Sequence, residues 1–146
     1  MGGIRPKSVF QVLGAGAVGT GSIRGMPFLA QLSDAGFAVW PFDEPKLATL
    51  VEIYPRLLTA SVRKSSQPDR EAYLQRAYPT LNPTLASAAA GSEDAFDAAV
   101  SALVMRAHCS LLLSLRRTDD AVVALEGQIW FPGAATTSLD DTASSG

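Results

Sequence analysis

Cysteine and histidine are scarce in this sequence, and their scarcity excludes several kinds of site. Cys109 is the only cysteine and His108 the only histidine among 146 residues. A chain with one cysteine cannot form an internal disulfide or a zinc site built from several cysteines. Any mechanism that needs an imidazole base must use His108, and on a helix its neighbour Cys109 points about 100° away. We therefore predict a packed thiol and a helix-surface imidazole rather than a nucleophile and its base.

Long apolar runs and a strong excess of charge are also missing. The sequence has no run of about 18 apolar residues, and residues 1–7 lack the apolar core of a signal peptide. Twelve Lys and Arg against 14 Asp and Glu give a formal net charge of −2, so any contact with nucleic acid must be local. Because 47% of the residues are hydrophobic and 18% are charged, we expect a soluble globular domain. The single cysteine and the missing signal-peptide core and apolar run lead us to expect a cytoplasmic location and no membrane partner.

Hydrophobic patterning predicts alternating strands and helices, which indicates an α/β fold. The expected strands are Val9–Leu13, Phe37–Phe42, Leu47–Pro55 and Leu125–Pro132. The expected helices begin near Pro27 and end at Gly36, span Pro68–Ala77, and run from Glu93 to about Leu115 after a cap at Ser92 or Gly91. We expect an irregular link over Pro79–Gly91, a domain that ends at residue 132 and a disordered tail over 133–146.

A glycine-rich loop follows the first expected strand. Gly14, Gly16 and Gly19 have the G-x-G-x-x-G spacing that places a dinucleotide pyrophosphate at a helix N-terminus. That function needs an uninterrupted helix after the loop, whereas Gly25 and Pro27 would weaken its first turns. We therefore favour a turn between strand and helix, and keep a nucleotide-cofactor protein that uses Gly14–Gly19 as a weaker alternative.

Three acids and three cations are the candidate functional residues. Glu52 lies within an apolar segment, and Asp94 and Asp97 are neighbours on one face of the last long helix. These acids are surface residues in one interpretation and ligands of a divalent cation in the other, since Mg²⁺ and Mn²⁺ prefer carboxylate oxygen. Arg56, Arg63 and Lys64 form the best local basic cluster, which either is solvated surface or contacts phosphate. Trp40 and Trp130 are predicted core anchors.

Five blocks of the sequence, in order over about residues 5–132, carry a family resemblance. They are RPKSVFQVLGAGAVGTGSIRGMPFL, GFAVWPFD, VEIYPRLLT, SEDAFDAAVSALVM and LEGQIWFP. They resemble the C-terminal part of an uncharacterised domain-of-unknown-function family of predicted nucleases with the ribonuclease H-like fold. The VEIYP and SEDAFDAAVSAL blocks are similar to the acid-bearing strand and the last helix of such enzymes.

The resemblance implies a ribonuclease H-like mixed sheet with flanking helices. It also implies divalent-metal-dependent hydrolysis of phosphodiesters, with nucleic acid of unspecified strandedness as the partner. It makes Glu52, Asp94 and Asp97 the catalytic residues, with Glu52 and Asp97 as ligands of Mg²⁺ or Mn²⁺. Such folds begin with a β-hairpin whose first strand carries an Asp, and residues 1–7 contain no acid. We therefore expect a truncated, inactive relative that self-associates through an exposed sheet edge. The alternative is a non-catalytic binding or interaction domain of the same fold.

Overall fold

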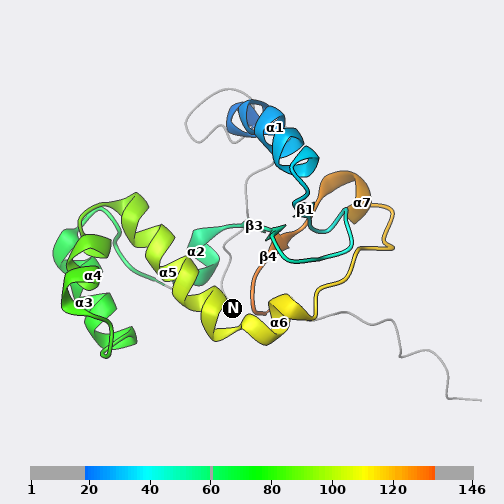
Figure 1. The fold of residues 1–146 in the computed structure, drawn as a ribbon. Helices are drawn as coiled ribbons and strands as arrows, with labels where there is room; N and C mark the ends of the chain where they lie inside the picture. The colour runs from blue at the N-terminus through cyan, green and yellow to red at the C-terminus, as the bar shows by residue number, and fades with distance from the viewer. Residues whose placement is uncertain (1–18, 60, 134–146) are drawn as a thin grey trace, which may run out of the picture.

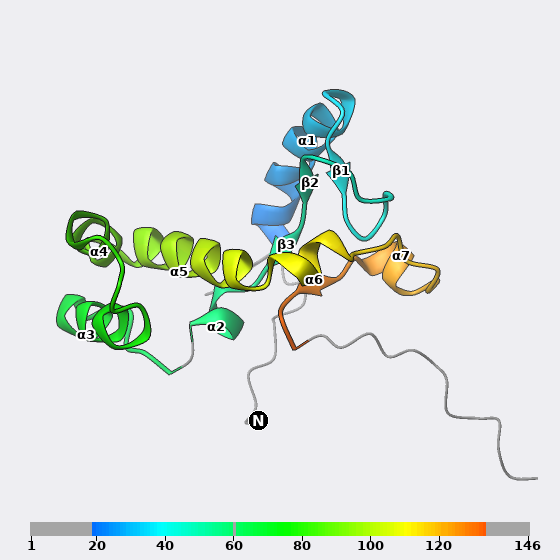
Figure 2. The same ribbon diagram turned by 60° about the horizontal axis from the view of Figure 1, so that its bottom comes forward.

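The fold combines seven helices and four short strands in the part of the chain that the structure, a computed structural model, describes: residues 19–59 and 61–133 (Figures 1 and 2). The helices are α1 Gly19–Asp34, α2 Pro55–Leu58, α3 Gln67–Ala77, α4 Pro83–Ala90, α5 Glu93–Ala107, α6 Cys109–Leu113 and α7 Val123–Glu126. The strands are β1 Ala38–Val39, β2 Thr49–Leu50, β3 Glu52–Ile53 and β4 Ile129–Trp130. The chain is therefore α/β, with far more helix than strand.

The strands form two separate parallel pairs. β1 pairs with β2, with Ala38 opposite Thr49, and β3 pairs with β4, with Ile53 opposite Trp130. The expected strands were too long, because Pro41 has no N–H to continue β1 and Ala48 adopts a positive φ of 65° just before β2. Within the described residues the sheet is thus two parallel pairs rather than one mixed sheet. The predicted Leu125–Pro132 strand is also wrong in its first half, which belongs to α7 and the turn at Gly127.

Helix α1 begins earlier than predicted. It starts at Gly19 and continues through Gly25 and Pro27, so the expected start near Pro27 and the expected interruption are wrong. Its end is as predicted: Gly36 has φ 93°, its N–H donates to the Ser33 carbonyl, and the Phe37 N–H donates to the Leu32 carbonyl. These two bonds form a Schellman cap, for which glycine in the left-handed region is best suited.

Helices α3, α4 and α5 pack together and form the main core. Its buried residues are Leu74, Ala89, Ala90, Phe96 and Val100. The predicted irregular link over Pro79–Gly91 is wrong, because it contains α4. Asn82 caps α4 by accepting from the Thr84 N–H at 2.9 Å, Pro83 occupies the first turn, and the following alanines have the highest helix propensity.

The helix predicted from Glu93 to about Leu115 divides in two at His108. Ser92 caps α5 as expected, because its Oγ accepts from the Ala95 N–H at 3.0 Å. His108 then has a φ of −111° and a ψ of 29°, values that end α5 before α6 begins. The predicted packing of the Cys109 thiol is wrong, because Cys109 is exposed.

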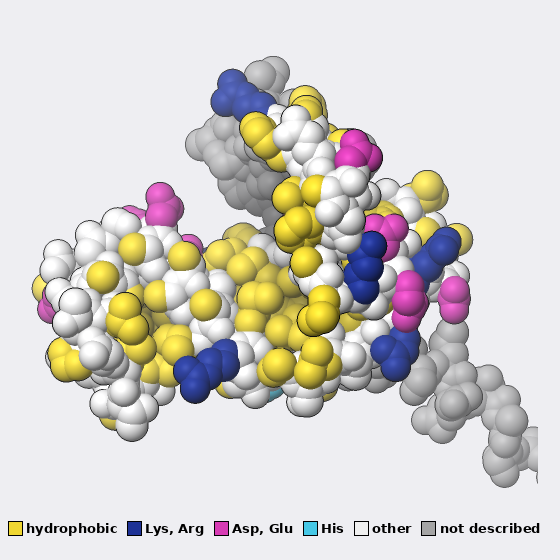
Figure 3. Space-filling view, in the orientation of Figure 1, with side chains coloured by type: hydrophobic (Ala, Val, Ile, Leu, Met, Phe, Trp, Pro, Cys, Tyr) yellow, Lys and Arg dark blue, Asp and Glu magenta, His cyan; other side chains and the backbone are white. Residues whose placement is uncertain are grey.

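The tryptophans near the strand pairs are buried, whereas large apolar side chains of α1 are exposed. Trp40 and Trp130 are buried beside the strand pairs, as predicted. Helix α1 exposes Ile23, Met26 and Phe28, and Figure 3 shows hydrophobic side chains on α1 and across the surface between α1 and α5. The predicted strand Val9–Leu13, residues Gly14 and Gly16, and all of the predicted 133–146 tail except Gly133 lie outside the described residues.

Candidate functional site

The three predicted catalytic acids lie on two elements. Glu52 is exposed on β3, and Asp94 is exposed in the first turn of α5. Asp97 lies one turn further along α5 and is half-buried. Helix α2 follows β3 almost directly and packs on α5, so the elements that carry Glu52 and Asp97 are connected through α2.

Asp97 forms an ion pair with Lys64. The distance between Lys64 Nζ and Asp97 Oδ1 is 2.5 Å, and the two side chains are 13% and 27% exposed. This oxygen is buried and no hydrogen bond of favourable angle reaches it, so the distance describes a charge contact. Ser101, one turn beyond Asp97, is buried, which makes this face of α5 a packed surface around the pair.

The described acids do not gather into a metal site. The part of the chain that the structure describes contains no group of three or more His, Cys, Asp or Glu side chains that could hold a metal ion. The cation that Asp97 contacts is the Lys64 ammonium group. A two-metal site needs several carboxylates, because the two cations repel each other. The described donor set does not fit two metal ions, and the roles of Glu52, Asp94 and Asp97 stay a prediction from the resemblance.

The three cations of the predicted basic cluster lie around one shallow pocket, here called the basic pocket. Its volume is about 570 Å³, and it lies where α2, the segment before α3 and the start of α5 meet. The lining residues are Arg56, Ser61, Val62, Arg63, Lys64, Ser65 and Glu93. Guanidinium, ammonium and hydroxyl groups are all hydrogen-bond donors, so the lining is rich in groups that bind anions.

The cations of the basic pocket differ in how they are paired. Arg63 Nε donates to Asp69 Oδ2 at 2.8 Å in an exposed pair, which leaves two of its three nitrogens without that partner. Lys64 contacts Asp97, and Arg56 has no ion-pair partner among residues 19–59 and 61–133. An exposed pair contributes only about 0–1 kcal/mol. Arg63 can therefore turn toward an incoming anion at little cost.

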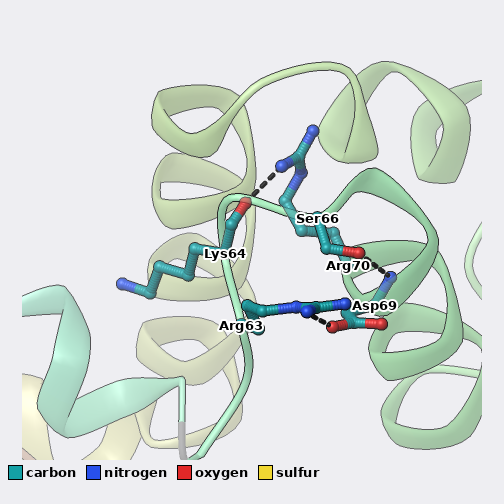
Figure 4. A network of polar contacts seen from close by, with 5 residues as sticks. All are labelled: Arg63, Lys64, Ser66, Asp69 and Arg70. Atoms are coloured by element: carbon teal, nitrogen blue, oxygen red, sulfur yellow. Dashed lines mark hydrogen bonds and ion pairs between the residues drawn. The ribbon is translucent and has the colours of Figure 1, made fainter.

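Arg70 holds the segment that forms the basic pocket, and sequence reasoning missed it. It is 5% exposed. Its Nε donates to the Ala90 carbonyl at 2.8 Å, and its Nη1 donates to the Lys64 carbonyl. Figure 4 shows the Lys64 carbonyl facing Arg70 while the Lys64 side chain points away from this network. The sequence signal for Arg70 is the apolar Leu74 four residues later, since residues four apart share one face of a helix.

Comparisons with known proteins do not assign this chain to a family, so its description rests on the fold and the site. No family model matches this chain, and neither a curated protein nor a solved structure matches it. None of the described helices combines the length and the apolar character needed to cross a membrane. The structure defines a helix-rich α/β chain with a shallow pocket lined by cations and hydroxyls.

Proposed function

We propose that this chain is a non-catalytic binding domain that holds phosphate groups of a nucleic acid in the basic pocket. The observation that carries the proposal is the meeting of Arg56, Arg63 and Lys64 with two serines around one pocket. Phosphate contacts from Arg and Lys supply most of the affinity in non-specific binding to nucleic acids. Because the net charge is −2, this local group must provide the attraction.

The start of α5 adds to the anion-binding character of the basic pocket. Glu93, the first residue of α5, lines the pocket, and the N-terminus of a helix carries a partial positive charge. The Glu93 carboxylate opposes that effect, since it repels a phosphate in the same pocket. Neutralising Glu93 should therefore strengthen phosphate binding, whereas neutralising an arginine of the pocket should weaken it.

The test is the binding of a fluorescently labelled single-stranded oligonucleotide, followed by anisotropy at several salt concentrations. Arg56→Gln should weaken binding by up to about tenfold and lower the slope of log K against log salt concentration by about one, the effect of one lost phosphate contact. Glu93→Gln should strengthen binding. Arg106→Gln, which removes an exposed cation at the far end of α5, is the matched control and should have a much smaller effect. Equal losses in Arg56→Gln and Arg106→Gln would show that the pocket is not the site.

A metal-dependent nuclease of the ribonuclease H-like fold is the second proposal. Its support is the sequence resemblance, together with the packing on α5, which carries Asp97, of helix α2, which follows the Glu52 strand almost directly. Cleavage of single- or double-stranded substrate with Mn²⁺, abolished by both Glu52→Gln and Asp97→Asn in folded protein, would support it. Binding without cleavage supports the first proposal alone.

A further inference from the structure

A second pocket lies between α3 and α4 and is independent of the basic pocket. This hairpin pocket has a volume of about 400 Å³, within the range of pockets that hold small organic ligands. It is lined by Glu71, Leu74, Gln75, Tyr78, Pro79, Leu81, Pro83, Ala86 and Ser87. None of the lining residues belongs to the basic pocket.

The periodicity of the two helices explains how the hairpin pocket is built. Glu71, Leu74, Gln75 and Tyr78 follow one another at intervals of three, one and three residues, so they form a single stripe along α3. Pro83, Ala86 and Ser87 form the corresponding stripe on α4. The Arg70 bond to the Ala90 carbonyl joins the far ends of the two helices, and the 78–82 turn joins their near ends, so the helices run antiparallel.

The antiparallel arrangement separates the apolar and polar groups of the lining. Tyr78, Pro79, Leu81 and Pro83 lie at the turn, whereas Glu71 and Ser87 lie toward the other end. The separation of seven positions from Glu71 to Tyr78 corresponds to roughly 10 Å along the helix. Leu74, which is 1% exposed, lies between the two ends. The hairpin pocket is therefore apolar at the turn and polar about two helical turns away.

One negative charge determines which ligand suits the polar end. Glu71 is the only acid in the lining and has no ion-pair partner in the part of the chain that the structure describes. Gln67 Nε2 donates to its Oε1 at 2.9 Å, which keeps the carboxylate in place. Burial, together with the neighbouring Tyr73, raises the pKa of Tyr78, so its phenol is uncharged at neutral pH. The lining thus presents one carboxylate and no cation.

We propose that the hairpin pocket binds a small primary amine with an aromatic or branched aliphatic body. The body contacts Tyr78, Leu81 and Pro83 at the turn, and the ammonium group contacts Glu71, with Gln75 and Ser87 as further hydrogen-bond acceptors.

The test is titration of the full chain with 2-phenylethylammonium, followed by backbone amide NMR shifts. Saturable shifts over residues 71–87 are expected, and 2-phenylethanol, the neutral analogue, should bind about tenfold more weakly because it lacks the charge contact, a factor equal to about 1.4 kcal/mol. Glu71→Gln should remove this difference, whereas Glu126→Gln, which removes an exposed acid on α7, should keep it. Ala86→Leu, which fills the hairpin pocket, should weaken both probes.

Several results would overturn the proposal. Equal binding of the amine and the alcohol would show that Glu71 does not select charge, and shifts outside α3 and α4 would place the site elsewhere. An absence of saturable shifts with 2-phenylethylammonium would also overturn the proposal. None of these results depends on oligonucleotide binding, so this proposal and the proposed function fail separately.

Discussion

At the scale of single residues, the buried guanidinium of Arg70 lies between two backbone carbonyls rather than beside a carboxylate. The Ala90 carbonyl belongs to the last turn of α4, where the helix dipole is negative and favours a cation. The Lys64 carbonyl belongs to the segment of the basic pocket. Arg70 therefore connects the α3–α4 hairpin to that segment, and its planar fork suits two acceptors in different directions.

Arg70→Lys should destabilise the chain by about 2–4 kcal/mol, because an ammonium on a flexible stem cannot reach both carbonyls and hydrogen bonds to charged groups contribute about 1.5–3 kcal/mol each. Arg76→Lys is the matched control on the same helix. Arg76 is exposed and lies over the Tyr73 ring at 5.9 Å, a contact of about 0.5–1 kcal/mol that lysine partly keeps. Urea unfolding measures both variants, and equal midpoints would contradict the role assigned to Arg70.

At the scale of elements, α1 contains one glycine in its interior and ends at another, and the two positions differ in whether they tolerate a side chain. Gly25 and Pro27 lie inside the helix, where each lowers its stability. A Cβ at Gly25 would meet no heavy atom within 4 Å. Gly36 has equal space around it but a φ of 93°, which a side chain tolerates poorly.

These two glycines should respond to alanine in opposite directions. Gly25→Ala should stabilise the chain by about 0.5–1 kcal/mol, because it lowers the entropy of the unfolded chain without a clash. Gly36→Ala should destabilise it by about 1 kcal/mol, the cost of a left-handed residue with a Cβ. Thermal unfolding followed by circular dichroism measures both. Stabilisation by Gly36→Ala would show that the Schellman cap is not formed as described.

At the scale of the whole molecule, large apolar side chains are more often exposed than buried. In the described residues, the buried ones are Trp40, Leu58, Leu74, Phe96, Val100 and Trp130. The exposed ones are Ile23, Met26, Phe28, Leu29, Phe42, Leu47, Leu85, Leu111, Leu113, Val122 and Leu125. Exposed apolar patches of this kind are typical of interaction surfaces or of chains prone to associate.

We therefore expect reversible self-association that increases with protein concentration. Ile23, Met26 and Leu29 follow one another at intervals of three residues and so form an exposed apolar stripe on α1. Met26→Lys, in the middle of that stripe, should lower the average mass, whereas Leu85→Lys on α4 tests an exposed apolar side chain elsewhere. Analytical ultracentrifugation over a range of concentrations measures both. A monomeric mass at every concentration would contradict the expectation.

Much of the local structure was predictable because it depends on residues close together in the sequence. Ser92 caps α5, and Gly36 ends α1, because side-chain caps and left-handed glycines act on their own helix end. The start of α4 was missed although Asn82 and Pro83 carry its signal. The start of α1 was missed because the penalties at Gly25 and Pro27, about 1 and 3 kcal/mol, predict a break, whereas the helix continues through both residues.

For the candidate sites, too, part could be predicted from the sequence and part depends on the tertiary structure. The sequence by itself determined which residue types are present to act, including the Arg56, Arg63 and Lys64 cluster and a chain with one cysteine and one histidine. Only the tertiary structure decided that Lys64 contacts Asp97, that Arg70 is buried against Ala90, and that α3 and α4 enclose a pocket. These contacts either join residues about 20 or more positions apart or depend on how two helices pack. Many compact arrangements of the chain are conceivable, and neither residue spacing nor composition tells which one forms these contacts.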